Sequence, residues 1–238
     1  MESLNEVKAI LQNTFYKTYR TGNIMIKLIA FDFDGTLADS VDFCLYAFET
    51  VFHKYMGSQA PSREDIYQNF GMNEPGVLRH YMGKFNHEAE NDFYQIHREK
   101  HPQMCPEAFP GCRELLEFLQ GKGIQLAVVT GRAEITCNIS LEFLGLKKYF
   151  SILRYGSAEK NDKAAQFREL IASGNLSDDE FIYVGDAVSD AAASHAANVK
   201  CLSAAWAKSA RINELEKINP GLVFRTIKDM QKYLNDII

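Results

Sequence analysis

The chain of 238 residues is longer than one small module needs, which leaves room for a large domain or for a core with an inserted unit. Hydrophobic residues make up 46% and charged residues 24%, which matches an ordinary globular protein and excludes wholesale disorder. The net charge of −5 argues against a surface that neutralises phosphates, so we expect no nucleic-acid partner. No apolar run approaches the roughly 18 residues of a membrane span, so we expect no membrane partner.

Cysteine usage and the amino terminus both indicate the compartment. Five cysteines are scattered along the chain and form no Cys-x-x-Cys pair, which favours free thiols in a reducing environment. The first residues, MESLNEVK, are acidic and lack the apolar segment of a secretory signal, so we predict a cytoplasmic protein. Residues 1–23 are predicted to be an N-terminal helical extension, because apolar side chains recur on one helical face: Val7, Ile10, Leu11 and Phe15.

Apolar runs of strand length alternate with helix-length segments through most of the chain. The strongest runs, each followed by a polar or glycine residue, are Ile26–Phe31, Ile124–Val129 and Phe181–Val184, and weaker ones are Phe150–Leu153, Val199–Leu202 and Leu222–Phe224. Helical patterns cover about 111–121, 134–145, 161–174, 188–197, 208–217 and 227–236. This alternation predicts an α/β fold with a Rossmann-like parallel sheet and helices on both faces.

One long stretch, residues 41–105, interrupts the alternation with helical segments only, such as Val41–Tyr55 and Asn86–Lys100. We predict that it forms a small helical domain inserted after the first strand, while residues 24–40 and 106–238 form the Rossmann-like core. Ligands of parallel sheets bind beyond the carboxyl ends of the strands. Because the insertion begins after a strand, the inserted domain would lie over that edge.

The most informative motif, Asp32-Phe33-Asp34-Gly35-Thr36-Leu37, directly follows the first apolar run. Alternate residues of a strand point the same way, so the carboxylates of Asp32 and Asp34 would repel each other. Mg²⁺ resolves that conflict, because it prefers oxygen ligands and commonly links carboxylates to phosphate. One carboxylate can then attack phosphorus while the other transfers protons. A bare Asp-x-Asp is more often a strand end with solvated acids. The other motifs therefore decide whether these two aspartates belong to a metal site.

Two further strand ends carry polar groups. Thr130-Gly131-Arg132 offers a hydroxyl, a backbone N–H and a guanidinium, which are three donors suited to a phosphate. In the segment GDAVSD at 185–190, Asp186 can complete an acidic metal site, and Asp190 can hold a partner on the same helical face. Singly, each motif also fits a turn or a helix N-cap.

A cation is required beside these acids, because several carboxylates and a phosphate dianion overload one magnesium ion. The segment between the second and third motifs offers Lys160 or Lys163. A single lysine is most often a solvated surface group, so the order of the motifs along the chain carries this interpretation.

Four such elements, in this order at successive strand ends, resemble the haloacid dehalogenase superfamily of aspartyl-phosphate-forming hydrolases. The matching segments are IAFDFDGTLADS, VVTGR, NDKAAQFREL and YVGDAVSD, and the resemblance covers essentially residues 26–205. The insertion is similar to the helical cap of that family. The segment HPQMCPEAFPGCRELLEFL looks like the phosphoglycolate-phosphatase branch.

The resemblance implies a role for each matching residue of the first two motifs. Asp32 would be the nucleophile and a metal ligand. Asp34 would be the general acid/base and would touch the metal through its backbone carbonyl. Thr130, together with the N–H of Gly131, would bind the transferring phosphoryl group.

The resemblance also assigns the later motifs. Lys163 would bind the phosphoryl group and stabilise the phosphoaspartate, and Asp186 would bind Mg²⁺. Asp190 would support the metal site and Lys163. Lys163 is preferred to Lys160 because it opens a predicted helix and precedes Gly185 by 22 residues, as in similar family members.

These expectations combine into a magnesium-dependent phosphatase that hydrolyses a small phosphorylated metabolite through an aspartyl phosphate. The namesake dehalogenases lack the second aspartate of the first motif, so Asp34 favours a phosphoryl substrate. Two alternatives stay open: a phosphosugar mutase of the same superfamily and a catalytically idle binding module. In the cap, the loop Gly71–Gly76 should face the site, where Arg79 or His80 could read a substrate anion. The identity of the substrate and the oligomeric state stay open.

Overall fold

The computed structural model describes residues 25–159 and 162–238, so the expectations for residues 1–23 and for Lys160 lie outside the described residues. Six parallel strands form one sheet in the order β3-β2-β1-β4-β5-β6, and the α/β prediction is confirmed. The strands are β1 (Leu28–Phe31), β2 (Gln125–Val129), β3 (Ile152–Arg154), β4 (Phe181–Gly185), β5 (Lys200–Ala204) and β6 (Val223–Phe224).

The central strand β1 pairs with β2 on one side and with β4 on the other, so the strand order reverses across it. Phe31 lies in register with Val128 and with Val184, which brings the carboxyl ends of the three strands to one level. The crevice beyond such a reversal is the usual ligand site of open parallel sheets. The strand-end motifs therefore meet at one edge.

Helices cover both faces of the sheet, because successive residues of a buried strand point to opposite sides. Ile29 and Phe31 pack against α6, α7 and α11, whereas Leu28 and Ala30 pack against α8 and α9, with α10 beside them. The core helices are α6 (Cys112–Gly121), α7 (Glu134–Phe143), α8 (Lys163–Gly174), α9 (Val188–Ala196), α10 (Ile212–Ile218) and α11 (Ile227–Ile237), with short 3-10 turns at Lys147–Tyr149 and Asp178–Glu180.

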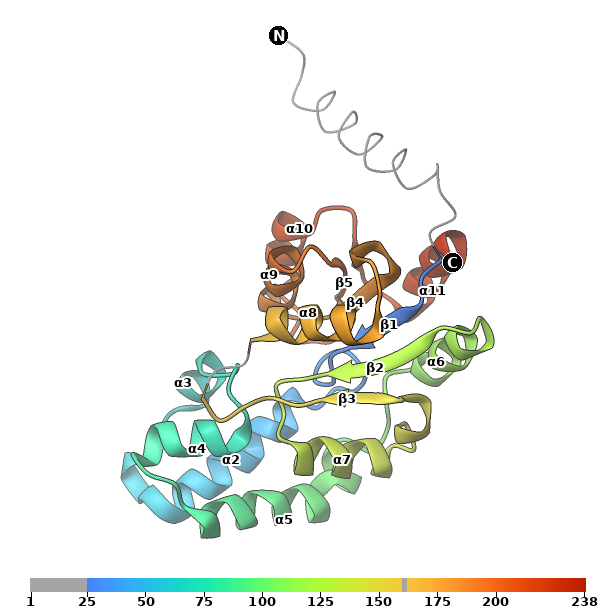
Figure 1. Cartoon of the computed structure of the whole chain (residues 1–238). Coiled ribbons are helices and arrows are strands. Elements are labelled where there is room, and N and C mark those ends of the chain that lie inside the picture. Colours follow the sequence, from blue (N-terminus) through green and yellow to red (C-terminus); the bar gives the residue numbers. More distant parts are fainter. Residues whose placement is uncertain (1–24, 160–161) are drawn as a thin grey trace.

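Four helices after β1 form a group with its own apolar centre. Phe48, Phe52 and Phe93 are buried at that centre. Figure 1 shows the group beyond the carboxyl ends of the strands, with α5 running alongside α7. Together they are the α2–α5 unit: α2 (Val41–Met56), α3 (Arg63–Gln68), α4 (Glu74–Met82) and α5 (His87–Met104), with a 3-10 turn at Gly57–Gln59.

The first turn of α4 joins the α2–α5 unit to the core. Asn73, the N-cap residue, donates from its side-chain amide to the carbonyl of Gly156 at 3.0 Å. The buried Glu74 carboxylate accepts from the N–H of Ala133 at 2.6 Å and from the hydroxyl of Thr136. The bond to Ala133 satisfies an N–H at the start of α7 that has no partner inside that helix.

Two histidines of α5 are buried where the α2–α5 unit meets the core. His97 packs between the rings of Phe43 and Phe93, with centroid distances of 4.5 and 4.8 Å. His101 Nε2 lies 3.0 Å from the hydroxyl of Ser140. Burial, aided by the charge of Arg132, lowers the pKa of His97 to about 3 and that of His101 to about 4. Both rings are therefore neutral in the folded protein at pH 7.

We expect His97→Phe to reduce the loss of stability in mild acid. Below the unfolded-state pKa of about 6.5, the unfolded chain binds a proton at His97 that the folded protein does not, so stability falls with pH. Between about pH 7.5 and pH 5, the free energy of unfolding should fall by about 2 kcal/mol more in the wild type than in His97→Phe. Denaturant unfolding at both pH values measures this difference.

A matched variant separates packing from titration at this position. Phe93→Leu removes ring contacts beside His97 without removing a titratable group, so it should lower stability by the same amount at both pH values. If the free energy of unfolding depended on pH equally in the wild type and in His97→Phe, His97 would not be neutral and buried in the folded protein.

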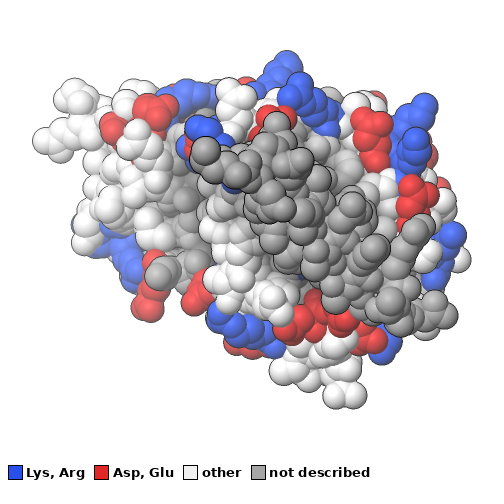
Figure 2. Space-filling view, turned by 90° about the horizontal axis from the view of Figure 1, so that it is seen from above, with Lys and Arg blue, Asp and Glu red and all other residues white. Residues whose placement is uncertain are grey.

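The described surface is mixed in charge. On the face in Figure 2, basic and acidic side chains are interspersed over the described part, in keeping with the net charge of −5. Within residues 25–159 and 162–238, every helix is too short or too polar to cross a bilayer.

Candidate active site

The site begins where β1 ends and the chain turns. The N–H of Asp32 donates to the carbonyl of Val184 at 2.8 Å, and the Asp32 carboxylate accepts from the N–H of Phe33 at 2.7 Å. Gly35 has a φ of 71°, a left-handed conformation that favours glycine. A Cβ at Gly35 would collide with the carboxylate of Asp186, so this glycine permits the close approach of the two strand ends.

Lys163, the first residue of α8, binds Asp32 directly. Its ammonium donates to Asp32 Oδ2 at 2.8 Å, to Asp190 Oδ1 at 2.6 Å and to the Tyr183 hydroxyl at 2.9 Å, which uses all three of its N–H groups. Burial alone would lower the pKa of Lys163, but the Asp190 and Asp32 carboxylates raise it. Tyr183, which the sequence analysis missed, donates to the carbonyl of Val129 at 3.0 Å and so fixes its oxygen beneath the ammonium.

Asp186 adds a third carboxylate to this cluster. One oxygen each from Asp32, Asp186 and Asp190 lies within 4.8 Å of the others. Among the described residues the Asp186 carboxylate has no hydrogen-bond or ion-pair partner, and burial beside Asp190 and Asp32 raises its pKa well above the ordinary value. The single ammonium of Lys163 leaves part of the negative charge uncompensated. Three oxygen ligands with surplus charge fit a divalent cation.

The Asp34 carboxylate pairs with Arg132, which follows β2, and does not join this cluster. Arg132 Nε lies 2.9 Å from Asp34 Oδ2, and Nη2 lies 2.6 Å from Oδ1. The hydroxyl of Ser40 donates to the same Oδ1 at 2.5 Å, and the thiol of Cys44 does so at 3.5 Å. Burial alone would raise the pKa of Asp34, but Arg132 and these donors bring it below its ordinary value. Asp34 is therefore ionised in this arrangement.

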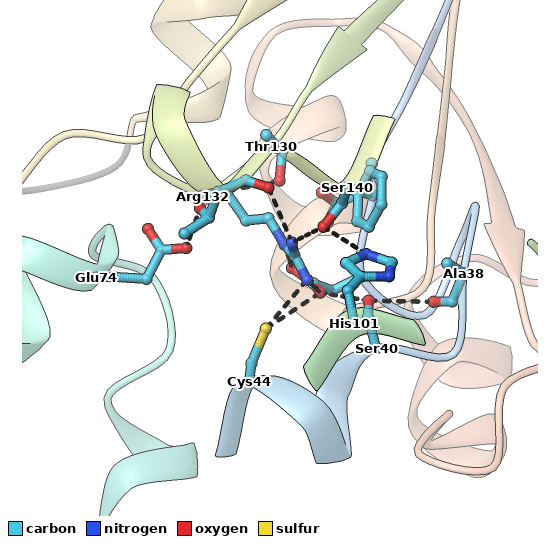
Figure 3. A network of polar contacts seen from close by, with 12 residues as sticks. Ala38, Ser40, Cys44, Glu74, His101, Thr130, Arg132 and Ser140 are labelled. Atoms are coloured by element: carbon cyan, nitrogen blue, oxygen red, sulfur yellow. Dashed lines mark hydrogen bonds and ion pairs between the residues drawn. The ribbon is translucent and has the colours of Figure 1, made fainter. Parts of the chain in front are cut away.

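The expectation that the Arg132 guanidinium is a phosphate donor is wrong. Besides Asp34, its N–H groups reach the Ser140 hydroxyl at 2.7 Å, the Thr136 carbonyl at 3.5 Å and Cys44 Sγ at 3.1 Å, so all its donors are used. Figure 3 shows this side chain extending from the end of β2 between Cys44 of α2 and Ser140 of α7. Arg132 therefore binds a site carboxylate and ties three elements together.

The rest of the second motif lies beside the carboxylates. Thr130 is fully buried, and its hydroxyl oxygen accepts from the N–H of Arg132 at 3.3 Å. Gly131 lines the same cavity as Asp32. A Cβ at Gly156, in the loop after β3, would collide with the Gly131 carbonyl, so this loop packs directly on the motif.

A cavity of about 630 Å³ opens over these residues, between the sheet edge and the α2–α5 unit. The cavity brings together six of the predicted core residues, namely Asp32, Asp34, Gly131, Lys163, Asp186 and Asp190. Thr130 does not line it.

The expectation that Arg79 or His80 reads a substrate anion does not fit this geometry, because neither residue lines the cavity. Arg79 donates to the carbonyl of Ala158 at 2.9 Å and lies over the ring of Phe85, 4.6 Å from its centroid. His80 is exposed on the outer side of α4. Of the loop before α4, Gly71 and Met72 do reach the cavity.

Residues 29–204 match the sequence profile of the haloacid dehalogenase-like hydrolases, and this range contains the carboxylate cluster, Lys163 and the Thr130–Arg132 motif. The chain belongs to this family. The predicted superfamily and the prediction of a hydrolase are thereby confirmed.

Curated and solved proteins agree with this assignment. The candidate pyrophosphatase PpaX of Clostridium perfringens is 32% identical to this hydrolase over 178 residues, which cover 74% of this chain and 82% of that protein. A phosphoglycolate phosphatase of Pseudomonas savastanoi is 27% identical over 221 residues, with 87% and 78% covered. A predicted phosphoglycolate phosphatase from Haemophilus somnus shares the fold, with a TM-score of 0.72 at 22% identity over 90% of this chain and 99% of that one.

Proposed function

We propose that this hydrolase is a magnesium-dependent phosphatase that cleaves small phosphomonoesters through an aspartyl phosphate on Asp32. The observation that carries the proposal is the Lys163 ammonium, which binds Asp32 and Asp190 beside the Asp186 carboxylate, which has no partner among residues 25–159 and 162–238. Such a cluster can present a carboxylate oxygen to phosphorus next to positive charge that stabilises the phosphoryl oxygens. The relatives named as a pyrophosphatase and as phosphoglycolate phosphatases support a phosphoryl substrate.

Two displacements at phosphorus account for hydrolysis. In the first, an Asp32 oxygen attacks phosphorus, the ester P–O bond breaks, and the leaving oxygen takes a proton from Asp34, which must first take one up from solvent because it is ionised beside Arg132. In the second, Asp34 takes a proton from water, the water oxygen attacks phosphorus, and inorganic phosphate leaves as the Asp32 carboxylate re-forms. The ionised Asp34 paired with Arg132 is in the form that the second displacement needs.

The remaining predicted residues bind the phosphoryl group and the metal. Thr130 and the N–H of Gly131 would hold phosphoryl oxygens, and Lys163 would stay beside the attacking oxygen of Asp32. Asp32, Asp186 and the backbone carbonyl of Asp34 would bind Mg²⁺, with Asp190 supporting both Lys163 and the metal site. When bound, Mg²⁺ supplies positive charge that draws the carboxylates and the phosphoryl oxygens together.

The α2–α5 unit would serve as the cap, comprising residues 41–105, over a catalytic core of residues 24–40 and 106–238. The contacts of Asn73 and Glu74 with the core would let it cover the cavity and exclude bulk water during phosphoryl transfer. The five cysteines are buried with free thiols, which fits the reducing environment of the cytoplasm.

We expect EDTA to abolish the hydrolysis of 4-nitrophenyl phosphate and excess Mg²⁺ to restore it. Ca²⁺ should substitute poorly, because it takes more ligands at longer distances and would misplace Asp32 relative to phosphorus. Asp186→Asn should raise the Mg²⁺ concentration needed for half-maximal activity by about 10-fold or more. The exposed Asp236→Asn is the matched control and should leave it unchanged. Full activity after exhaustive dialysis against EDTA would refute the metal site.

Release of inorganic phosphate distinguishes hydrolysis from the two alternatives. A phosphosugar mutase returns the phosphoryl group to a sugar and gives no net phosphate, whereas an idle module gives no turnover. We expect stoichiometric phosphate from a panel of phosphorylated metabolites, measured with a phosphate-specific colorimetric reagent. Isomerised sugar phosphate without free phosphate would favour the mutase.

A further inference from the structure

The α2–α5 unit forms one wall of the active-site cavity. The described residues of this wall include no cation. Two of its lining residues, Glu64 and Glu74, are acidic. Most of the others are apolar or aromatic: Val41, Phe48, Tyr67, Phe70, Met72 and Val77. Three aromatic rings adjoin one another, since the Phe70 centroid lies 6.3 Å from that of Phe48 and 5.4 Å from that of Tyr67.

The cations that the core contributes to the cavity are already engaged. The Lys163 ammonium uses its three N–H groups on Asp32, Asp190 and Tyr183. The Arg132 guanidinium is buried on Asp34 and its neighbours. Arg211, the other described cation of the lining, sits exposed at the rim and pairs with Glu214 at 3.3 Å.

A second anionic group on the substrate would therefore be poorly solvated. It would lose water against the rings of Phe48 and Phe70 and would approach the carboxylate of Glu64, with no free cation in the described lining to replace that water. An uncharged ring or hydrocarbon would instead remove apolar surface from water on both sides.

We propose that the preferred substrates are phosphomonoesters whose leaving group is uncharged and presents an apolar or aromatic face. This proposal rests on the proposed phosphatase activity. Such a preference differs from that of an enzyme that acts on a phosphorylated carboxylic acid or on a pyrophosphate, because those leaving groups are anionic. The cavity volume of about 630 Å³ lies within the range of about 300–1,000 Å³ that holds drug-sized ligands, far more than a two-carbon leaving group fills.

Three substrates with primary alcohol leaving groups separate size from charge. Benzyl phosphate carries a ring, ethyl phosphate is small and uncharged, and 2-phosphoglycolate is small and anionic. We expect kcat/KM for benzyl phosphate to exceed that for ethyl phosphate by on the order of 10-fold or more, because the wall buries the ring. Ethyl phosphate should exceed 2-phosphoglycolate by on the order of 10-fold, because the carboxylate is desolvated without a partner.

Variants of the wall link this preference to the α2–α5 unit. Phe70→Ala removes a ring of the wall and should lower the ratio of kcat/KM for benzyl phosphate to kcat/KM for ethyl phosphate. Phe85→Ala removes an exposed ring of the same unit that does not line the cavity, and it should change neither value. Met72→Lys adds a cation to the wall and should raise kcat/KM for 2-phosphoglycolate relative to benzyl phosphate.

Binding without turnover tests the preference independently of catalysis. Benzylphosphonate should bind more tightly than phosphonoacetate in calorimetry, again by on the order of 10-fold. A higher kcat/KM for 2-phosphoglycolate or pyrophosphate, or tighter binding of phosphonoacetate, would overturn the proposal while the phosphatase function stands. No phosphate release from any ester, with benzylphosphonate still preferred, would overturn the proposed function and leave the cavity preference supported.

Discussion

Asp32→Asn is expected to reduce phosphate release from 4-nitrophenyl phosphate by more than about 10⁴-fold, because a neutral amide is a poor nucleophile and a poorer metal ligand. Asp34→Asn should lose about 10²–10⁴-fold, the usual contribution of a positioned proton-transfer group. Asp34→Asn should still bind Mg²⁺, because the proposed contact of Asp34 with the metal is its backbone carbonyl. Steady-state kinetics and a Mg²⁺ titration of each variant measure these effects.

A nearby aspartate provides the control for both substitutions. Asp39 lies exposed in the same turn after β1, and Asp39→Asn should retain nearly all activity. Circular dichroism of the three variants checks that each is folded. Near-normal turnover by Asp32→Asn or Asp34→Asn would remove the residue concerned from the proposed mechanism.

Lys163→Ala is expected to lower turnover by on the order of 10²–10³-fold, as does the loss of other preorganised donors to developing charge. It also leaves Asp32 and Asp190 without their shared cation. Lys163→Arg should recover little, because a planar guanidinium cannot donate to acceptors arranged around a compact ammonium as Asp32, Asp190 and Tyr183 are. Kinetics and thermal unfolding of both variants separate lost catalysis from lost stability.

Lys160→Ala is the matched control, since Lys160 lies three residues earlier in the same segment. It should keep most of its activity, because the contacts with Asp32 and Asp190 come from Lys163. If Lys160→Ala were the inactive variant, the assignment of Lys163 as the catalytic lysine would be wrong. Full activity of both alanine variants would contradict a catalytic lysine altogether.

The fold could be predicted from the sequence because its strands are short apolar runs buried on both faces. All six predicted strands form, and the polar residues that follow β1, β2 and β4 meet because these strands pair in parallel and in register. The contact of Lys163 with Asp32 also agrees with the prediction that α8 opens at that lysine.

The polar network behind Asp34 could not be predicted in the same way, because periodicity does not identify the partners of a buried charge. Arg132 was expected to face a phosphate, yet it binds Asp34 across the sheet edge. A signal was present, since Asp34 and Arg132 follow the paired residues Phe31 and Val128 at similar distances and carry opposite charges. Tyr183 gave no such signal, because in the sequence a strand tyrosine that binds a site lysine cannot be distinguished from one that only packs in the core.

The cap residues escaped prediction for a related reason. Arg79 and His80 lie on the helix after the predicted loop, but Arg79 binds the carbonyl of Ala158, and His80 is exposed. Only the face of α4 that points into the cavity can line it. Glu74 occupies that face, where its carboxylate caps the start of α7. Sequence alone gave the position of the loop and not the rotation of α4 about its axis.

The most direct test of the account is a search for the covalent phosphoryl group on Asp32. Asp34→Asn should accumulate this intermediate from 4-nitrophenyl phosphate, because the leaving group needs no proton whereas the attacking water does. After acid quenching and proteolysis, mass spectrometry should find one added phosphoryl group on the peptide that contains Asp32, and Asp32→Asn should show none. A phosphoryl group on another residue, or turnover by direct attack of water with no covalent species, would contradict the proposed mechanism.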